Sequence, residues 1–154
     1  EKAVKELGVK VADGNIFDTK CDILAPCALG AVLDERTIAN LKCAIVCGTA
    51  NNQLRNPNED GDALAKRGIL YSPDFVANAG GLIRLAGLYL GMTEGEIDHK
   101  ISEIETTTAA VLKQASGGST GAAAIAFAKA KIAAGAAKKQ MAGAGCGTGC
   151  GCKA

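Results

Sequence analysis

Aromatic residues are scarce in this chain of 154 residues: they make up 3% of it, and tryptophan is absent. Alanine and glycine therefore fill the space that aromatic rings usually fill. The length predicts a single domain that is large enough for a core of its own. An excess of charge is also missing, because the formal net charge is +1, which argues against nucleic acid or an anionic membrane as a partner. No apolar run reaches the length of a membrane span, and we expect no signal peptide from these residues.

The residues that common catalytic mechanisms need are missing as well. His99 is the one histidine, and it has no Asp or Ser partner near it in the sequence, so histidine general-base chemistry is not expected. Lys66 and Arg67 lie on a polar helix face, where a solvated role is expected. No nucleophile elbow and no G-x-G-x-x-G motif after a predicted strand is present. We therefore predict no catalytic residue within this chain.

Cysteine occurs seven times, an odd number. Four of these residues fall in or beside apolar runs, where cysteine behaves as a small hydrophobic residue: Cys21, Cys27, Cys43 and Cys47. Three more, Cys146, Cys150 and Cys152, do not complete a tetrahedral metal site without a nearby histidine. Since no partner that would activate the Cys27 thiol is visible in the sequence, we favour a packing or cofactor-wall role for it. The pattern predicts no disulfide framework, no metal site and a reducing, cytoplasmic location.

The segment Ser72–Leu85, SPDFVANAGGLIRL, predicts a loop that becomes a helix. Pro73 disfavours a helical residue before it, and Asp74 is placed to cap the amide groups that follow. The adjacent glycines Gly80 and Gly81 cost helix stability, roughly 1 kcal/mol each relative to alanine. Two explanations stay open: the close approach of a flat ligand ring to the backbone, or tight packing of the helix against a sheet.

Short apolar runs alternate with helical patterns in the first half of the chain. The strand candidates are Cys21–Ala25, Cys43–Cys47 and Ile69–Tyr71. Helices are predicted between them, over Asp34–Leu41 with Asp34 as its cap, and over Ala63–Arg67 after a loop at Asn56–Asp62. This alternation predicts an α/β fold with a Rossmann-type parallel sheet and helices on both faces, followed by C-terminal helices.

Polar or glycine-rich loops follow all three strand candidates directly. These loops are Pro26–Gly30, Thr49–Gln53 and Ser72–Gly81. Each alone would be interpreted as an ordinary turn. The carboxyl ends of parallel strands meet at one edge of a sheet, however, and ligands bind outside that edge. The three loops together therefore predict a ligand site at this edge.

The segments that flank this region are less specific. Glu1–Leu7 resembles the tail of a helix, Val9 and Val11 alternate as in a short strand, and the chain reads as though it began within a domain. Helical spacing of apolar residues predicts two later helices, over Thr93–Ala115 and over Ser119–Ile132. The remainder is rich in glycine, alanine and lysine, and we expect it to be disordered or weakly helical.

Three strings in this sequence resemble the amino-acid dehydrogenase family that includes the glutamate, leucine, phenylalanine and valine enzymes. They are CDILAPCALGAVLDERTIANLKCAIVCGTANNQL, RGILYSPDFVANAGGLIRLAGLYLG and, more weakly, STGAAAIAFAKAKI. Together they cover most of Gly8–Ile132, and the first two are long and nearly free of gaps. The branch that they resemble most is that of leucine and phenylalanine dehydrogenase.

The resemblance implies an NAD-binding Rossmann domain from an enzyme that oxidises an L-amino acid reversibly to a 2-oxo acid and ammonia. In this reading residues 1–91 form a partial NAD-binding domain, residues 92–132 a C-terminal helical segment, and residues 133–154 a flexible or poorly assigned tail. Family members are oligomers, so a homo-oligomer is expected. The partners implied are a hydrophobic L-amino acid or its 2-oxo acid, and ammonia.

The resemblance also implies the residues of a cofactor site. The cofactor-binding residues are Ala25, Pro26, Cys27, Ala28, Asn51, Asn52, Asn78, Gly80 and Gly81. Asn78 would hold the nicotinamide end, Asn51 would contact the nicotinamide ribose or the substrate, and the glycine pair would let the ring come close. Leu82 and Leu85 would shape a substrate pocket that suits an apolar side chain and offers a glutamate carboxylate nothing.

The sequence also departs from the family pattern. The glycine-rich fingerprint, the acidic residue that binds the adenosine ribose, and the lysines and aspartate that carry out catalysis are all missing from these 154 residues. We therefore expect this chain alone to be inactive. Two alternatives stay open: a non-catalytic oligomerisation module, in which the late helices make subunit contacts, or another NAD-dependent oxidoreductase on the same fold.

Overall fold

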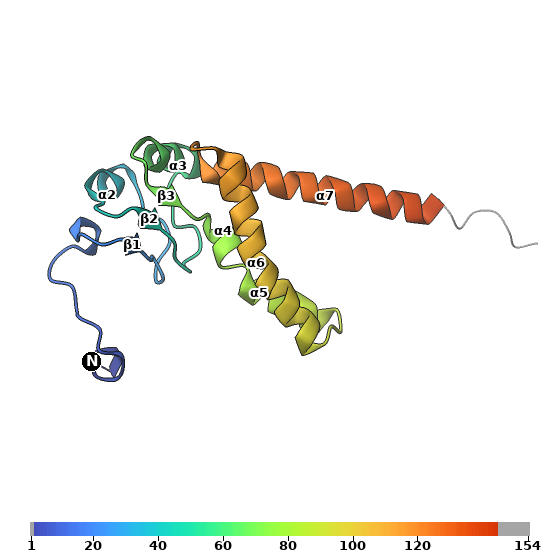
Figure 1. Ribbon diagram of the computed structural model, residues 1–154, viewed down its shortest axis with the longest axis horizontal. Helices are drawn as coiled ribbons and strands as arrows, with labels where there is room; N and C mark the ends of the chain where they lie inside the picture. The colour runs from blue at the N-terminus through green and yellow to red at the C-terminus, as the bar shows by residue number, and fades with distance from the viewer. Residues whose placement is uncertain (1, 145–154) are drawn as a thin grey trace, which may run out of the picture.

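Three short parallel strands form a sheet in the first half of the chain. The computed structural model describes residues 2–144, and its strands are β1 (Ile23–Leu24), β2 (Ile45–Val46) and β3 (Leu70–Tyr71). They lie in the order β1-β2-β3 (Figure 1). Each lies within its predicted apolar run, and helices follow the sheet, so the α/β fold predicted from the sequence is confirmed.

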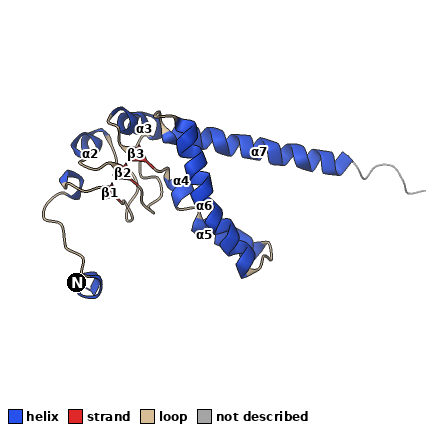
Figure 2. Ribbon diagram, viewed as in Figure 1, coloured by secondary structure: helices blue, strands red, loops and turns tan. Residues whose placement is uncertain are grey.

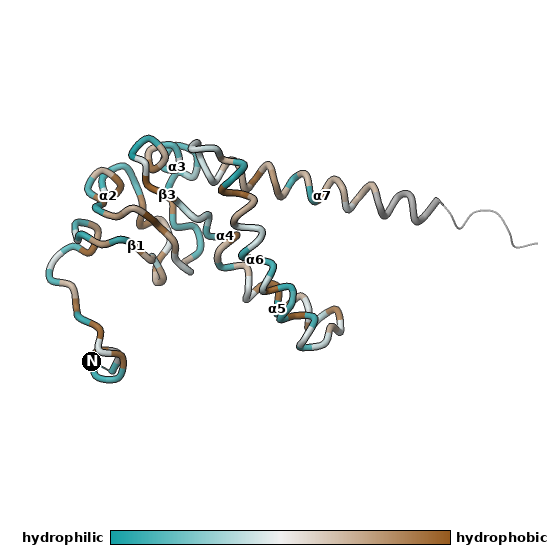
Figure 3. Tube along the Cα trace, viewed as in Figure 1, coloured by the Kyte–Doolittle hydropathy of each residue, from teal (hydrophilic) through white to brown (hydrophobic). Residues whose placement is uncertain are grey.

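Two helices, α2 (Glu35–Asn40) and α3 (Pro57–Lys66), connect the strands and pack on the same face of the sheet (Figure 2). Right-handed crossovers between strands that follow one another in space place successive helices on one side. Apolar side chains from the strands, helices and loops form the core there: Leu24, Leu33, Ile38, Leu41, Val46, Leu54, Leu64, Ile69 and Tyr71. Figure 3 shows the hydropathy of the residues along the trace of these elements.

The other face of the sheet differs from the expectation of helices on both faces. Strand side chains point alternately to the two faces, so Ile23 and Leu70 face away from the core. These two side chains are 56% and 43% exposed. Within residues 2–144, the connecting helices therefore cover one face of the sheet.

Helix α3 begins earlier than the sequence suggested, because Asn56–Asp62 was expected to form a loop. Pro57 is the first residue of this helix, a position where its missing N–H costs nothing. Glu59 and Asp60 lie in the first turn, where negative charge is favourable, and Asp60 Oδ2 accepts a hydrogen bond from the Asn56 amide at 2.6 Å. The turn-forming residues of this segment therefore start a helix.

Arg67 has a structural partner that the sequence did not reveal. Its guanidinium donates hydrogen bonds to the carbonyl of Ile38 and, at 2.9 Å, to that of Leu41. These carbonyls lie at the end of α2, where helices leave acceptors unsatisfied. The expectation of a purely solvated Arg67 is therefore wrong, since this side chain ties α3 to α2.

Helix α1 (Lys2–Leu7) lies away from the sheet (Figure 1). The 3₁₀ turn η1 (Ile16–Asp18) instead contacts α2, and its Phe17 packs against the core. The strand expected at Val9 and Val11 is not found, and these side chains are 46% and 76% exposed. No strand within residues 2–144 pairs with this segment, so its backbone has no ladder to join.

Within residues 2–144, four helices follow the sheet: α4 (Asp74–Ala77), α5 (Gly80–Tyr89), α6 (Glu94–Ala115) and α7 (Thr120–Ala144). As the sequence predicts, Thr93 caps α6: its hydroxyl accepts from the Glu96 amide at 3.3 Å, and Glu96 accepts from the Thr93 amide at 2.8 Å. A second small core of Val76, Val111, Ala123 and Ala124 joins α4, α6 and α7.

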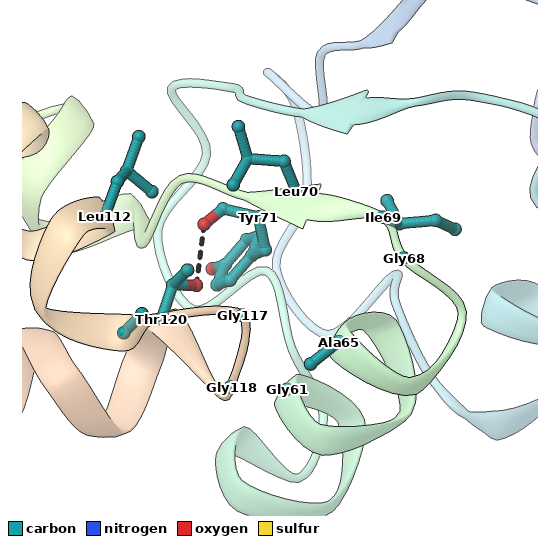
Figure 4. Close-up of a pocket in the computed structure, with 11 residues that line it drawn as sticks. Gly61, Ala65, Gly68, Ile69, Leu70, Tyr71, Leu112, Gly117, Gly118 and Thr120 are labelled. Atoms are coloured by element: carbon teal, nitrogen blue, oxygen red, sulfur yellow. Dashed lines mark hydrogen bonds between the residues drawn. The ribbon is translucent and has the colours of Figure 1, made fainter.

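The turn between α6 and α7 fastens these helices to the sheet. Thr120 donates its hydroxyl proton to the carbonyl oxygen of Tyr71 at 2.6 Å, beside a small pocket of about 140 Å³ (Figure 4). The two glycines of the turn, Gly117 and Gly118, line this pocket. Helix α7 then runs past Ile132, where the sequence predicted its end, to Ala144 (Figure 1).

The contact between α5 and α6 gives a prediction for stability. A Cβ on Gly87 would lie 2.6 Å from Cγ1 of the buried Ile97, so Gly87→Ala overpacks this contact. We expect it to lower the free energy of unfolding by about 1–3 kcal/mol, measured by urea denaturation. Gly95→Ala in α6 is the control, because its Cβ would meet nothing within 4 Å. Equal effects of the two substitutions would contradict the packing described.

Candidate functional site

The loops that follow the three strands meet at one edge of the sheet, as the sequence predicts. The loop after β2 is bonded to the loop after β1, because the Ala50 amide donates to the Pro26 carbonyl at 2.9 Å. Farther along, the Ala31 amide donates to the Asn52 carbonyl at 2.7 Å, and the Leu33 amide to the Gln53 carbonyl at 3.0 Å. The first two loops therefore form one hydrogen-bonded surface.

Side chains join the loop after β2 to the segment after β3. Asn78 Nδ2 donates to Asn51 Oδ1 at 2.6 Å and to the Thr49 carbonyl at 3.3 Å. The Asn52 amide donates to Asp74 Oδ2 at 2.5 Å. Asp74 was expected to cap the helix that follows it, but Pro73 occupies the cap position of α4 and makes no side-chain cap bond. The Asp74 carboxylate instead holds the neighbouring loop.

An open groove of about 890 Å³ lies against these joined loops. It is lined from the loop after β2 by Thr49, Asn51 and Asn52, from α4 and its end by Asp74 and Asn78, and from α5 and α6 by Gly80, Gly81, Leu82, Leu85, Ile101 and Ile104, among others. Most of the site residues that the resemblance implies therefore face one space. Ala25–Ala28 do not line this groove, although Pro26 is bonded to its wall.

The two adjacent glycines have different surroundings. A Cβ on Gly80 would lie 3.9 Å from the side chains of Ile101 and Ile104, which is ordinary packing of α5 against α6. A Cβ on Gly81 would meet nothing within 4 Å. The sequence left two explanations open for this pair. Packing suits Gly80, although its neighbour is the helix α6 and not the sheet. Open space for a ligand suits Gly81.

The groove is nearly uncharged. Asp74 is its one ionisable side chain among the described lining residues, which include no Lys, Arg or His. Leu82 and Leu85 are 73% and 69% exposed, so the helix side presents apolar surface. Such a surface can hold a neutral polar group against the asparagines and an apolar group against the leucines, but it cannot neutralise a carboxylate.

Two residues that sequence reasoning did not single out brace the loop after β2. Gln53 is fully buried, and its Nε2 donates to the carbonyls of Gly48 and Ala50 at 2.8 and 3.0 Å. Gly48 lies so close to the Pro26 backbone that any Cβ would overlap its carbonyl oxygen. Gln53 is the last residue of the polar run Thr49–Gln53, and Gly48 lies directly before this run, so their positions were the only signal in the sequence.

The Cys27 thiol has a hydrogen-bond partner in Thr49. Hydrogen bonds from Thr49, most strongly from its side chain, lower the pKa of this exposed cysteine. The sequence did not show this pairing, because Thr49 belongs to the loop after the next strand. A lowered pKa increases the fraction of thiolate near neutral pH, and the thiolate is the reactive form.

Two kinds of site have no support within residues 2–144. No group of three or more His, Cys, Asp or Glu side chains there is gathered closely enough to hold a metal ion. None of the helices described combines the length with the apolar content that a membrane crossing needs. Cys146, Cys150 and Cys152 lie outside the described residues.

Comparison with known proteins identifies the class. The family model of Glutamate/Leucine/Phenylalanine/Valine dehydrogenase matches residues 2–134, and the chain belongs to this family. Leucine dehydrogenase of Thermoactinomyces intermedius is 45% identical over 105 residues, which are 68% of this chain and 28% of that protein. Valine dehydrogenase of Streptomyces coelicolor is 43% identical over 115 residues, which are 75% of this chain and 31% of that protein.

A solved structure shows the same fold. The crystal structure of L-tryptophan dehydrogenase from Nostoc punctiforme matches with a TM-score of 0.80 and 39% identity, over 85% of this chain and 41% of that chain. Of the leucine and valine dehydrogenases named above, the chain spans less than a third of the length. Its family and fold are shown.

The contact between Cys27 and Thr49 gives a prediction for reactivity. We expect Thr49→Val to slow alkylation of Cys27 by iodoacetamide several-fold near neutral pH, because the hydroxyl that favours the thiolate is lost. Peptide mass spectrometry after timed alkylation measures the rate. Thr106→Val, on the exposed surface of α6, is the matched control. An unchanged Cys27 rate in Thr49→Val would contradict this contact.

Proposed function

We propose that this chain supplies the nicotinamide-binding wall of an NAD-dependent dehydrogenase that oxidises a hydrophobic L-amino acid to its 2-oxo acid and ammonia. The observation that carries this proposal is the hydrogen bond between Asn78 and Asn51 at the edge of the groove. It joins loops from two strands beside Gly81, where the backbone is open to close approach. Membership of the family supports the same reaction class.

The polar atoms of the groove fit a nicotinamide carboxamide. Both hydrogens of Asn78 Nδ2 are directed to oxygens, and because the Thr49 carbonyl is purely an acceptor, this amide orientation is determined. Asn78 Oδ1 and Asn51 Nδ2 then have no hydrogen-bond partner among the described residues. They offer an acceptor oxygen and a donor NH₂ group, the complement of a carboxamide. When bound, NAD supplies hydride acceptance, and the residues of this chain hold and orient it.

The apolar side of the groove supports a hydrophobic substrate. Leu82 and Leu85 project from α5 and are largely exposed. A substrate side chain that covers them is removed from water, which is favourable by roughly 25 cal/mol per Å² of apolar surface. The described groove offers no cation for the amino-acid carboxylate, and its one carboxylate, Asp74, is bonded to the Asn52 amide. We therefore expect no turnover by this chain alone, and turnover of leucine or phenylalanine with NAD would contradict that expectation.

The long helix α7 supports a second candidate function, in assembly. It runs beyond the rest of the structure as a single helix, and its Ile132 is 72% exposed (Figure 1). Apolar surface of this kind suits contacts between copies of the chain, which would make the protein a homo-oligomer.

The described cysteines Cys21, Cys27, Cys43 and Cys47 are all free, which fits the reducing cytoplasm that we propose as its location.

One substitution separates the cofactor role from the assembly role. The matching segment of the Thermoactinomyces leucine dehydrogenase is replaced by that of this chain, and Asn78→Ala is made in the chimera. We expect kcat/KM to fall by about 10- to 100-fold, because hydrogen bonds of about 1–3 kcal/mol are lost, while the oligomer stays intact. Steady-state kinetics and light scattering measure the two effects.

The control for this experiment is Asn40→Ala, an exposed asparagine at the end of α2, which should change neither quantity. Loss of the oligomer with full activity per protomer in Asn78→Ala would favour the assembly module. A folded Asn78→Ala chimera with unchanged kcat/KM and an unchanged oligomer would remove this residue from the cofactor site.

The substrate preference gives a further prediction. Leu82→Ala enlarges the apolar side of the groove, so the preference should shift toward bulkier amino acids by about 1–3 kcal/mol per methylene-scale change. The ratio of kcat/KM for phenylalanine to that for leucine measures this shift in the same chimera. Leu88→Ala is the matched control, because Leu88 is exposed on α5 and does not line the groove. An unchanged ratio in Leu82→Ala would show that Leu82 is outside the pocket.

A further inference from the structure

The carboxylate of Asp74 is directed to the protein's own backbone. It is half-buried and lines the groove, but one of its oxygens faces the backbone of the loop after β2, and the other faces a side chain of β3. Oδ2 accepts the Asn52 amide at 2.5 Å, and Oδ1 lies 3.4 Å from the hydroxyl of Tyr71. A hydrogen bond to an ionised acceptor is stronger than one between neutral groups. The bond to Asn52 is thus the main attachment of this side chain.

Asn52 is held in a conformation that needs support. Its φ of 52° is left-handed, a region that asparagine tolerates better than most residues but that still costs energy. Its backbone is fixed from both sides, by Asp74 at the amide and by the Ala31 amide at the carbonyl, 2.7 Å away. Its side chain makes no hydrogen bond among the described residues. The backbone geometry of Asn52 is therefore what the Asp74 bond maintains.

This geometry determines where Asn51 points. Asn51 is the next residue back, and its Oδ1 accepts from Asn78 at 2.6 Å. Asn78 lies four residues after Asp74, at the end of α4. The same short helix therefore contacts the loop twice, once through each side chain. Release of the first contact would let Asn52 leave its left-handed conformation and carry Asn51 away from Asn78.

We propose that Asp74 is a positioning residue, which holds the Asn51–Asn78 pair in the arrangement that receives the nicotinamide end of NAD; this rests on the proposed function. Asp74 acts through the Asn52 amide and does not touch the reacting atoms. Tyr71 completes the arrangement, since burial, together with the Asp74 carboxylate, raises the pKa of its phenol and keeps it a neutral donor. The acidic residue after β3 thus acts on the loop after β2.

The test uses the 154-residue chain labelled with ¹⁵N for the resonances and for hydrogen exchange, and the leucine dehydrogenase chimera described above for the dissociation constant of NAD. In the protein without NAD, Asp74→Ala should shift the side-chain amide resonances of Asn51 and Asn78 and speed hydrogen exchange at the Asn52 amide about tenfold. The dissociation constant for NAD should rise by about tenfold, the fold-change that corresponds to loss of one charge-assisted hydrogen bond. Asp74→Asn, which keeps an acceptor but no charge, should lie between wild type and Asp74→Ala.

The controls separate this inference from the proposed function. Asp98→Asn removes the same charge from the exposed surface of α6 and should change nothing. Should the Asn51 and Asn78 resonances stay in place in Asp74→Ala, the positioning role is overturned, whatever happens to NAD. It is equally overturned if Asn78→Ala weakens NAD binding while Asp74→Ala does not. If Asn78→Ala leaves NAD binding unchanged, the proposed function is contradicted, and the positioning role of Asp74, which rests on it, is contradicted as well. Should Asp74→Ala unfold, Asp74→Asn decides by the same criteria.

Discussion

The hydrogen bond from Asn78 to Asn51 joins two loops that are 27 residues apart in the chain. It exists because β2 and β3 are neighbours in a parallel sheet, so that both loops leave the sheet at the same edge. Together with the Asn78 bond to the Thr49 carbonyl and the Asn52 amide bond to the Asp74 carboxylate, it attaches α4 to the loop after β2. The groove, its glycines and its exposed leucines all depend on this attachment.

The loop after β2, at the edge of the sheet, is held rigidly and supports this arrangement. The loop after β2 is braced internally by the buried side chain of Gln53 and is pressed against the Pro26 backbone at Gly48. A loop fixed in this way loses little entropy when a ligand binds, which favours affinity. The helices behind the groove are fixed in turn by Thr120, which bonds to the end of β3. Polar contacts therefore surround an interior that has few aromatic side chains.

Local sequence was enough for much of this structure. The apolar runs located all three strands, and Asp34 and Thr93 cap helices as their spacing predicts. The edge at which Asn51 and Asn78 meet follows from the order of strands and loops alone. The failures share a cause, since Arg67 and Asp74 bond to groups 29 and 22 residues away, which local patterns cannot reveal. The strand expected at Val9 and Val11 failed because pairing needs a neighbour, and none is present within residues 2–144.

Direct contact between the nicotinamide ring and the groove is the central claim, and nuclear Overhauser effects measure it. With NAD added to the labelled chain, we expect cross-peaks from the nicotinamide protons to the Hα atoms of Gly81 and to the side-chain amides of Asn51 and Asn78. ADP, which lacks the nicotinamide and its ribose, should give none of them. Bound NAD whose nicotinamide protons show contacts only with residues outside the groove would contradict the account.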